Sequence, residues 1–240
     1  MPNPTAAMLV IGDEILSGRT RDANMHHLAQ ALTGAGIDLK EVRVVSDDAR
    51  AIVDAVRALS EAWDTVFTSG GIGPTHDDIT ADAIGAAFGA SVDVRDDARA
   101  LLAAHYEKSG SELNAARLRM ARIPEGATLI ENPVSVAPGF SLGNVHVMAG
   151  VPAVFQAMVA SVLPTLTGGA PLVSRTLRVD RGEGDVAETL GGIAARWGDL
   201  SIGSYPFQRD GRYGTNIVVR GADTDRVDTA IAELETAFPA

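Results

Sequence analysis

The chain of 240 residues is 46% hydrophobic and 21% charged, an ordinary profile for a globular protein, and its formal net charge is −11. It has no cysteine, which excludes disulfides, thiolate metal sites and cysteine nucleophiles, and its negative charge argues against nucleic acid as a partner. No apolar run approaches the roughly 18 residues of a membrane span, and the N-terminus lacks a positive signal segment, so we expect a cytoplasmic protein without a membrane partner.

The first 45 residues predict a strand, a helix and a second strand. Residues 5–11 are a continuous apolar run, typical of a strand buried on both faces of a parallel sheet. The sequence Gly12-Asp13-Glu14 follows this strand, at the edge of the sheet where α/β folds bind ligands. A helix is predicted from residue 22 or 23 to about 35, and an alternating strand from 37 to 45.

Two neighbouring acids, Asp47 and Asp48, separate the second strand from a helix that is predicted over residues 49–62. Asp47 suits the N-cap position of this helix, which would account for it locally. It also stands at the C-terminal end of a strand, which favours a place in the ligand cleft. The two roles are compatible, because one carboxylate can cap a helix and face a metal ion.

A glycine-rich loop joins the next strand to the next helix. The strand is predicted over residues 65–68 and the helix over 79–88, with Gly70, Gly71 and Gly73 between them. Glycine lets the backbone approach a ligand closely, and the N–H groups at a strand-to-helix junction point at an anion. The loop therefore predicts a phosphate site.

An acid pair, Asp77 and Asp78, ends this loop. Two carboxylates would repel a phosphate, and a bound divalent cation such as Mg²⁺ is the simplest way to reconcile them. The alternative is an ordinary Gly-Pro turn in which Asp78 is only the N-cap of the following helix.

After the glycine-rich loop and its helix, the chain continues the α/β pattern up to the linker that ends at residue 171. A short strand is predicted over 90–94, helices over 96–108 and about 113–121, strands over 128–130 and 144–148, and a helix that opens near Pro152. A Gly-Gly-Ala-Pro linker ends at residue 171, and a β-α-β-β-α order follows, which predicts a small α+β sandwich with a mainly antiparallel sheet. The GxxG sequence at 211–214 falls between two strands and indicates a hairpin turn.

The sequence from Ser69 to Thr80, Ser-Gly-Gly-Ile-Gly-Pro-Thr-His-Asp-Asp-Ile-Thr, closely resembles the phosphate loop of the competence/damage-inducible protein A (CinA) family. That family belongs to the MoaB/Mog-like molybdopterin-binding superfamily, whose molybdopterin enzymes usually carry Gly-Gly-Thr-Gly and then Arg-Asp. Ile72 and Asp77 depart from that pattern and favour the CinA branch. Gly12 to Gly18 and the Asn24 region resemble the superfamily after its first strand, and Gly150-Val-Pro152 resembles the family's Leu-Pro-Gly-Val-Pro.

The resemblance implies an α/β fold, a three-layer mostly parallel sheet over residues 1–167, followed by a KH-like α+β domain over 171–240. CinA proteins often continue into a deamidase domain; this sequence ends at Ala240, so we expect no such activity. Superfamily members usually self-associate, so a homo-oligomer is expected. The site residues that we expect to contact the substrate are Gly12, Asp13, Glu14, Asn24, Ser69, Gly70, Gly71, Gly73, Thr75, Gly150 and Pro152.

Three functions fit these observations. The first is a nucleotide pyrophosphatase that uses a divalent metal (Mg²⁺, Mn²⁺ or Co²⁺) to hydrolyse ADP-ribose or a related dinucleotide such as FAD. Its catalytic residues would be Asp47 and Asp78 as metal-associated acids and Asp77 as a second-sphere or water-activating acid. The second is a molybdopterin-binding protein or molybdopterin adenylyltransferase-like enzyme, against which Ile72 and the acid pair count. The third is a module that binds a pterin or nucleotide without turnover.

Overall fold

The computed structural model describes residues 2–209 and 211–239 and divides the chain into two compact units, Met1–Gly169 and Ala170–Ala240. In the part of the chain that it describes, no helix has the length and apolar character needed to cross a bilayer.

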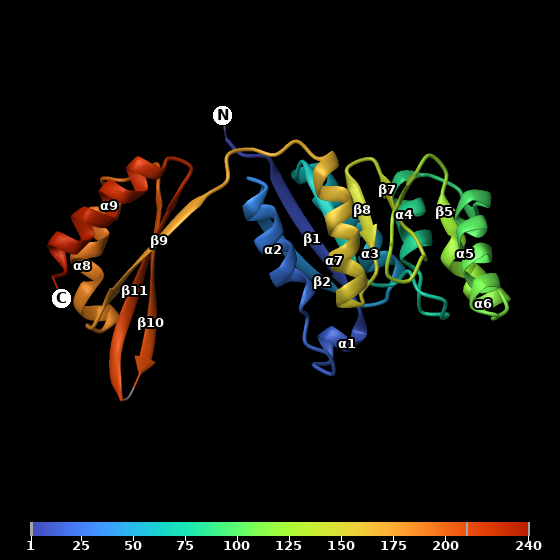
Figure 1. Cartoon of the computed structure of the whole chain (residues 1–240), viewed down its shortest axis with the longest axis horizontal. Helices are drawn as coiled ribbons and strands as arrows, with labels where there is room; N and C mark the ends of the chain where they lie inside the picture. Colours follow the sequence, from blue (N-terminus) through green and yellow to red (C-terminus); the bar gives the residue numbers. More distant parts are fainter. Residues whose placement is uncertain (1, 210, 240) are drawn as a thin grey trace. The chain divides into compact units, whose positions relative to one another are not determined.

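The first unit is built on a six-stranded sheet with the order β2-β1-β3-β8-β7-β6. The pairs β2/β1, β1/β3 and β3/β8 are parallel, whereas β7 runs antiparallel to both of its neighbours. This confirms the mostly parallel α/β sheet (Figure 1). The six strands are β1 (Thr5–Ile11), β2 (Asp38–Val45), β3 (Thr65–Ser69), β6 (Thr128–Ile130), β7 (Gly139–Leu142) and β8 (Val145–Met148).

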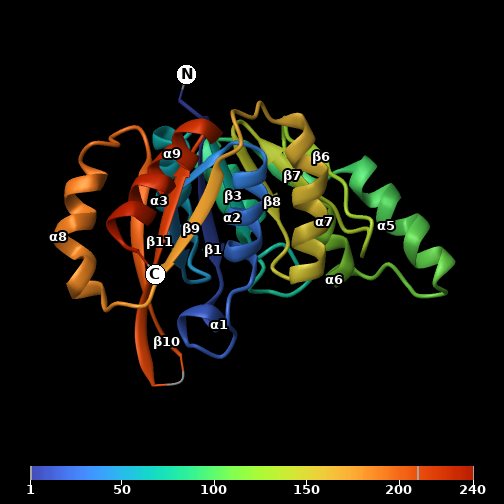
Figure 2. The same cartoon turned by 60° about the vertical axis from the view of Figure 1, so that its left-hand side comes forward.

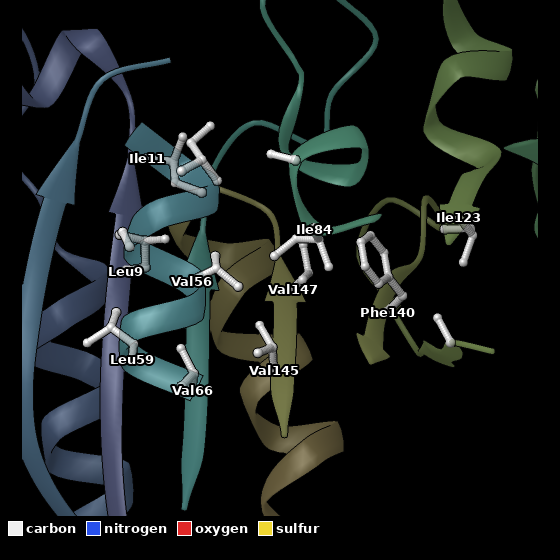
Figure 3. Close-up of a cluster of buried hydrophobic side chains, with 14 of the residues drawn as sticks. Leu9, Ile11, Val56, Leu59, Val66, Ile84, Ile123, Phe140, Val145 and Val147 are labelled. Atoms are coloured by element: carbon white, nitrogen blue, oxygen red, sulfur yellow. The ribbon is translucent and has the colours of Figure 1, made fainter. Parts of the chain in front are cut away.

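Helices cover both faces of this sheet. Along β1, Ala7, Leu9 and Ile11 pack into the core under α3 (Ala49–Ala62) and α4 (Thr80–Phe88), as Figure 3 shows for two of them. The alternate residues of β1 pack under α2 (Asn24–Gly34) and α7 (Pro152–Val162). Both sides of the strand are thus buried in apolar contacts, which is why its sequence is apolar throughout rather than alternating.

The remaining elements of the first unit are short, apart from one helix. They are α1 (Asp13–Leu16), β4 (Val92–Val94), α5 (Asp96–Lys108), α6 (Ala115–Leu118), the 3₁₀ turn η1 (Arg119–Ala121), β5 (Arg122–Pro124) and the 3₁₀ turn η2 (Leu163–Thr165).

Two predicted elements of this unit differ from the structure. The single helix expected over 113–121 is instead α6 followed by η1, because the chain then leaves as β5 to pair antiparallel with β4. The loop expected up to Phe140 already contains β7, which begins at Gly139. At Gly139 an added Cβ would lie 2.4 Å from the carbonyl oxygen of Val147, so a close approach between strands requires this glycine.

The second unit has the predicted β-α-β-β-α order: β9 (Val173–Val179), α8 (Glu183–Ala194), β10 (Ser201–Arg209), β11 (Arg212–Gly221) and α9 (Thr224–Ala237). Its sheet has the order β10-β11-β9 and is antiparallel throughout. The two helices pack on one face over a core that includes Trp197, Ile217 and Leu234. The hairpin of β10 and β11 extends past both helices (Figure 2), and residue 210, between these strands in the sequence, lies outside the described residues.

A buried histidine gives the first unit a predictable response to acid. His146 on β8 is 9% exposed and lies beside Phe67, and its Nδ1 is 2.7 Å from the hydroxyl oxygen of Ser141. Burial lowers the pKa of His146 from 6.5 to about 4. Between these pH values the imidazole is therefore protonated in the unfolded chain but neutral in the folded chain. The free energy of unfolding therefore falls as the pH drops through this window, by about 3 kcal/mol in total.

We expect His146→Gln, which cannot titrate, to shrink the difference in unfolding free energy between pH 7 and pH 4 by about 3 kcal/mol. Urea titrations at a series of pH values measure this difference. His26→Gln, at an exposed histidine, serves as the matched control and should leave the pH dependence of the unfolding free energy as it is in the parent. If His146→Gln has the same pH dependence of unfolding free energy as the parent, burial of His146 is not its cause.

Candidate active site

One cavity, of about 550 Å³, lies at the C-terminal edge of the parallel strands. Loops that follow four neighbouring strands contribute to its wall, as α/β folds commonly arrange their ligand sites. Most of the residues predicted to bind substrate, metal or water line it: Gly12, Glu14, Asp47, Gly70, Gly71, Gly73, Asp77, Asp78, Gly150 and Pro152.

The glycine loop after β3 is held tightly against the sheet. The Gly70 amide donates to the carbonyl oxygen of Met148 at 3.1 Å, and the Thr80 hydroxyl donates to the Gly70 carbonyl oxygen at 3.0 Å. Gly70 has a φ of +112°, and an added Cβ would lie 2.2 Å from the carbonyl oxygen of Ile11. Because that neighbour is backbone, only glycine fits this position.

Asp78 closes a turn within the loop rather than capping α4. One oxygen of its carboxylate accepts from the amide of Thr75 at 2.8 Å and from the Thr75 hydroxyl at 2.5 Å. The N-cap of α4 is Ile79, which offers no side-chain hydrogen bond, so the capping alternative for Asp78 was wrong. Within the described residues the other carboxylate oxygen accepts no hydrogen bond, which leaves it available to a ligand of the cavity.

Asp47 was also expected to cap a helix, and this was wrong: Asp48 is the N-cap of α3 and accepts from the amide of Ala51 at 2.8 Å. Asp47 instead accepts from the amide of Asp13 at 2.9 Å. Partial burial raises the pKa of Asp47 above its usual range, and the charges of Asp13, Glu14 and Asp77 add to this rise. A carboxylate that is crowded by other carboxylates gains most from a bound cation.

Asp77 differs electrostatically from Asp47. It is exposed, and the nearby Thr75 side chain lowers the pKa of its carboxyl, although the hydroxyl of Thr75 donates its hydrogen bond to Asp78. The imidazole of His76 lies 3.9 Å from it. A lowered pKa makes a weak base, so of the two carboxylates Asp47 is better suited to take a proton from water.

Four predicted residues do not line the cavity: Asp13, Asn24, Ser69 and Thr75. Asn24 is 3% exposed and donates to the hydroxyl oxygen of Ser69 at 2.7 Å and to the carbonyl oxygen of Gly150 at 2.8 Å. It therefore ties the start of the glycine loop to the turn before α7 from behind the wall. Thr75 positions the carboxylate of Asp78 through two hydrogen bonds. Asp13 positions the carboxylate of Asp47 through its backbone amide.

Several lining residues had no assigned role in the sequence prediction. Asn132 accepts from the amides of Val134 and Ser135 at 3.1 Å and so shapes the loop opposite the glycine loop, a local pattern that an Asx-turn search finds. Met120 has no such local signal. The apolar part of the wall comprises Ile11, Ile72, Met120, Ala137, Ala149, Val151 and Val154.

The carboxylates of the cavity could bind a divalent cation only together with other ligands. In the described portion of the chain no three Asp, Glu or His side chains are gathered closely enough to hold a metal ion by themselves. Asp47 and Asp78 each have one oxygen engaged with the protein and face the same cavity. Mg²⁺ is typically held by one or two carboxylates together with water and substrate phosphates, and this donor set suits that arrangement.

Comparison with known proteins assigns both parts of the chain to known families. Residues 7–168 match the family described as "probable molybdopterin binding domain", and residues 171–240 match the "FAD synthase, middle domain". The first unit is therefore a domain of the molybdopterin-binding type. The crystal structure of the protein CinA from Thermoplasma acidophilum is 34% identical, with a TM-score of 0.63, over 69% of this chain and 99% of that chain. The chain belongs to the CinA family.

Two further relatives extend the comparison. A CinA-like protein of Citrifermentans bemidjiense is 39% identical over 68% of this chain, and a probable FAD synthase of Caenorhabditis elegans is 31% identical over 96% of this chain. The aligned regions cover 40% and 49% of those two proteins, so this chain spans less than half the length of each.

Proposed function

We propose that this chain is a divalent-metal-dependent nucleotide pyrophosphatase. One observation carries the proposal: the glycine loop and the three carboxylates of Asp47, Asp77 and Asp78 line the same cavity. Its volume of about 550 Å³ falls in the range that small-molecule sites occupy. A loop that attracts phosphate, beside carboxylates that attract a metal ion, is the combination that hydrolysis of a diphosphate requires.

Different parts of the cavity wall have different roles in this reaction. Backbone N–H groups of the glycine loop would hold one phosphate, and Asp78, whose second carboxylate oxygen accepts no hydrogen bond within the described residues, would hold the cation together with water and substrate phosphate. A bound Mg²⁺, Mn²⁺ or Co²⁺ would screen the charge and polarise a phosphoryl oxygen. Asp47, whose pKa is raised, accepts a proton from the attacking water as one P–O bond of the diphosphate breaks. Asp77, whose pKa is lowered, stays ionised at the rim and adds to the negative potential that attracts the cation.

The substrate candidates are ADP-ribose and FAD. The CinA family suggests ADP-ribose, whereas the match of both units to FAD synthase relatives adds weight to FAD. Both are dinucleotides with a central diphosphate, so the same site chemistry applies. The apolar wall around Met120 and Val154 suits the planar ring of a base.

Adenylylation of molybdopterin is the second candidate, because residues 7–168 match a molybdopterin-binding domain. Ile72 and Asp77 stand where the molybdopterin enzymes usually carry Thr and Arg, and this counts against it. A site that binds a pterin or a nucleotide without turnover is the third.

The test is hydrolysis of ADP-ribose and of FAD by the parent protein with Mg²⁺, Mn²⁺ or Co²⁺, with EDTA as the control. We expect release of AMP from either dinucleotide, from FAD together with FMN, that depends on the added metal and stops with EDTA. Absence of AMP with every metal would reject the proposal. An assay with molybdopterin and ATP would then distinguish adenylylation from binding alone.

A further inference from the structure

Three arginines lie within the six residues 117–122, and two of them have clear partners. The guanidinium of Arg117 is 4.5 Å from the centroid of the Tyr106 ring and donates to the carbonyl oxygen of Glu112. Arg122 pairs with both carboxylate oxygens of Asp82, at 2.6 and 2.7 Å. These two side chains are satisfied by the protein itself and hold the segment in place.

Arg119, between them, is different. In the described part of the structure no acidic side chain pairs with it, and it makes one hydrogen bond, from Nη2 to the carbonyl oxygen of Asp78 at 3.2 Å. Its Nε is buried and has no partner. A buried charged donor without a partner is costly, so its presence beside the glycine loop calls for a compensating role.

The cavity next to Arg119 is short of positive charge. Four carboxylates line it, those of Glu14, Asp47, Asp77 and Asp78, whereas no Lys or Arg is among its described lining residues. Met120, the residue after Arg119, lines the cavity. The guanidinium therefore lies directly behind the wall that carries the acid pair, and an anion that enters the cavity would feel its charge through low-dielectric protein.

We propose that Arg119 is a positioning residue of this site, which fixes the end of the glycine loop through Asp78 and supplies the positive potential that a diphosphate anion needs there. The inference rests on the proposed function only in taking a diphosphate as the ligand. It does not require turnover, because an anion-binding site can be measured without hydrolysis. Loss of the charge, rather than loss of the hydrogen bond, should weaken binding of the anion.

Two variants separate these effects. Arg119→Gln and Arg119→Lys both keep a donor for the carbonyl of Asp78, but only lysine keeps the charge. Arg117→Gln, in the same segment and paired elsewhere, is the matched control. Calorimetric titration with inorganic pyrophosphate in the presence of Mg²⁺, which offsets the charge of the lining carboxylates, measures binding of the anion, and melting temperatures report the fold. A parent protein that binds no pyrophosphate under these conditions would overturn the inference.

We expect Arg119→Gln to raise the Kd for inorganic pyrophosphate about tenfold, equivalent to ~1.4 kcal/mol. Arg119→Lys should stay within about threefold of the parent, and Arg117→Gln should match it. If Arg119→Gln binds pyrophosphate as tightly as the parent, or if both Arg119 variants lose affinity equally, the charge has no such role and the inference fails. A parent that binds pyrophosphate but hydrolyses no dinucleotide would reject the pyrophosphatase proposal and leave this one standing.

Discussion

Asp47→Asn is expected to lower turnover of the preferred dinucleotide by about 10²–10⁴-fold, the range for loss of a general base. Asparagine keeps the shape of the side chain and can still accept from the Asp13 amide, which now donates to Asp47 at 2.9 Å. It cannot accept a proton and binds a cation less well. The loss should therefore appear in kcat more than in KM, because the glycine loop that holds the phosphate is unchanged.

The same substitution should not destabilise the protein at neutral pH. The folded-state pKa of Asp47 is raised, so its ionised form costs stability at every pH above that pKa. Asparagine removes this cost, and the melting temperature at pH 7 should equal or exceed that of the parent. The difference should disappear as the pH falls below the unfolded-state pKa, where the aspartate is protonated in both states.

Asp48→Asn is the matched control. Asp48 is exposed and caps α3, and asparagine is as good an N-cap as aspartate. Both activity and melting temperature should stay near parent values. Equal losses of activity in the two variants, or a large loss of melting temperature in Asp47→Asn alone, would mean that Asp47 is structural.

Gly70→Ala is expected to cost the first unit about 2–5 kcal/mol of unfolding free energy. A positive φ costs a residue with a Cβ about 1–2 kcal/mol, and overpacking a tight contact adds about 1–3 kcal/mol. Here the contact is 2.2 Å to the backbone oxygen of Ile11 on β1, which is paired on both sides and cannot move aside without breaking the sheet. The loop should lose its shape and the cavity its phosphate-binding wall.

Gly89→Ala separates backbone strain from the clash. Gly89 ends α4 with a φ of +70°, and an added Cβ would meet nothing within 4 Å. Its cost should be only about 1–2 kcal/mol. Each unit holds one of the two tryptophans, so urea titrations followed by Trp63 fluorescence in a Trp197→Phe background report the first unit. Equal destabilisation by both glycine variants would contradict the steric argument at Gly70.

Local signals in the sequence determined most of the architecture. The apolar run of residues 5–11 indicated a strand buried on both faces, and the helices over 49–62 and 96–108 match α3 and α5. Glycines and acids that follow strands marked the edge of the sheet where the cavity lies. These predictions succeed because the chain can satisfy helix periodicity, strand periodicity and strand-end turns using neighbours in the sequence.

Only the tertiary structure decided which polar group does what within that edge. By residue type Asp47 and Asp48 are equally suited to cap a helix. In the structure Asp47 accepts a hydrogen bond from the amide of Asp13, 34 residues away, and Asp48 caps the helix. Asn24 was expected to face the ligand, yet it is buried because Ser69 and Gly150 supply its hydrogen-bond partners. Arg119 comes from a segment predicted as plain helix. Each of these outcomes depends on contacts between residues far apart in the chain, which leave no periodic trace in the sequence.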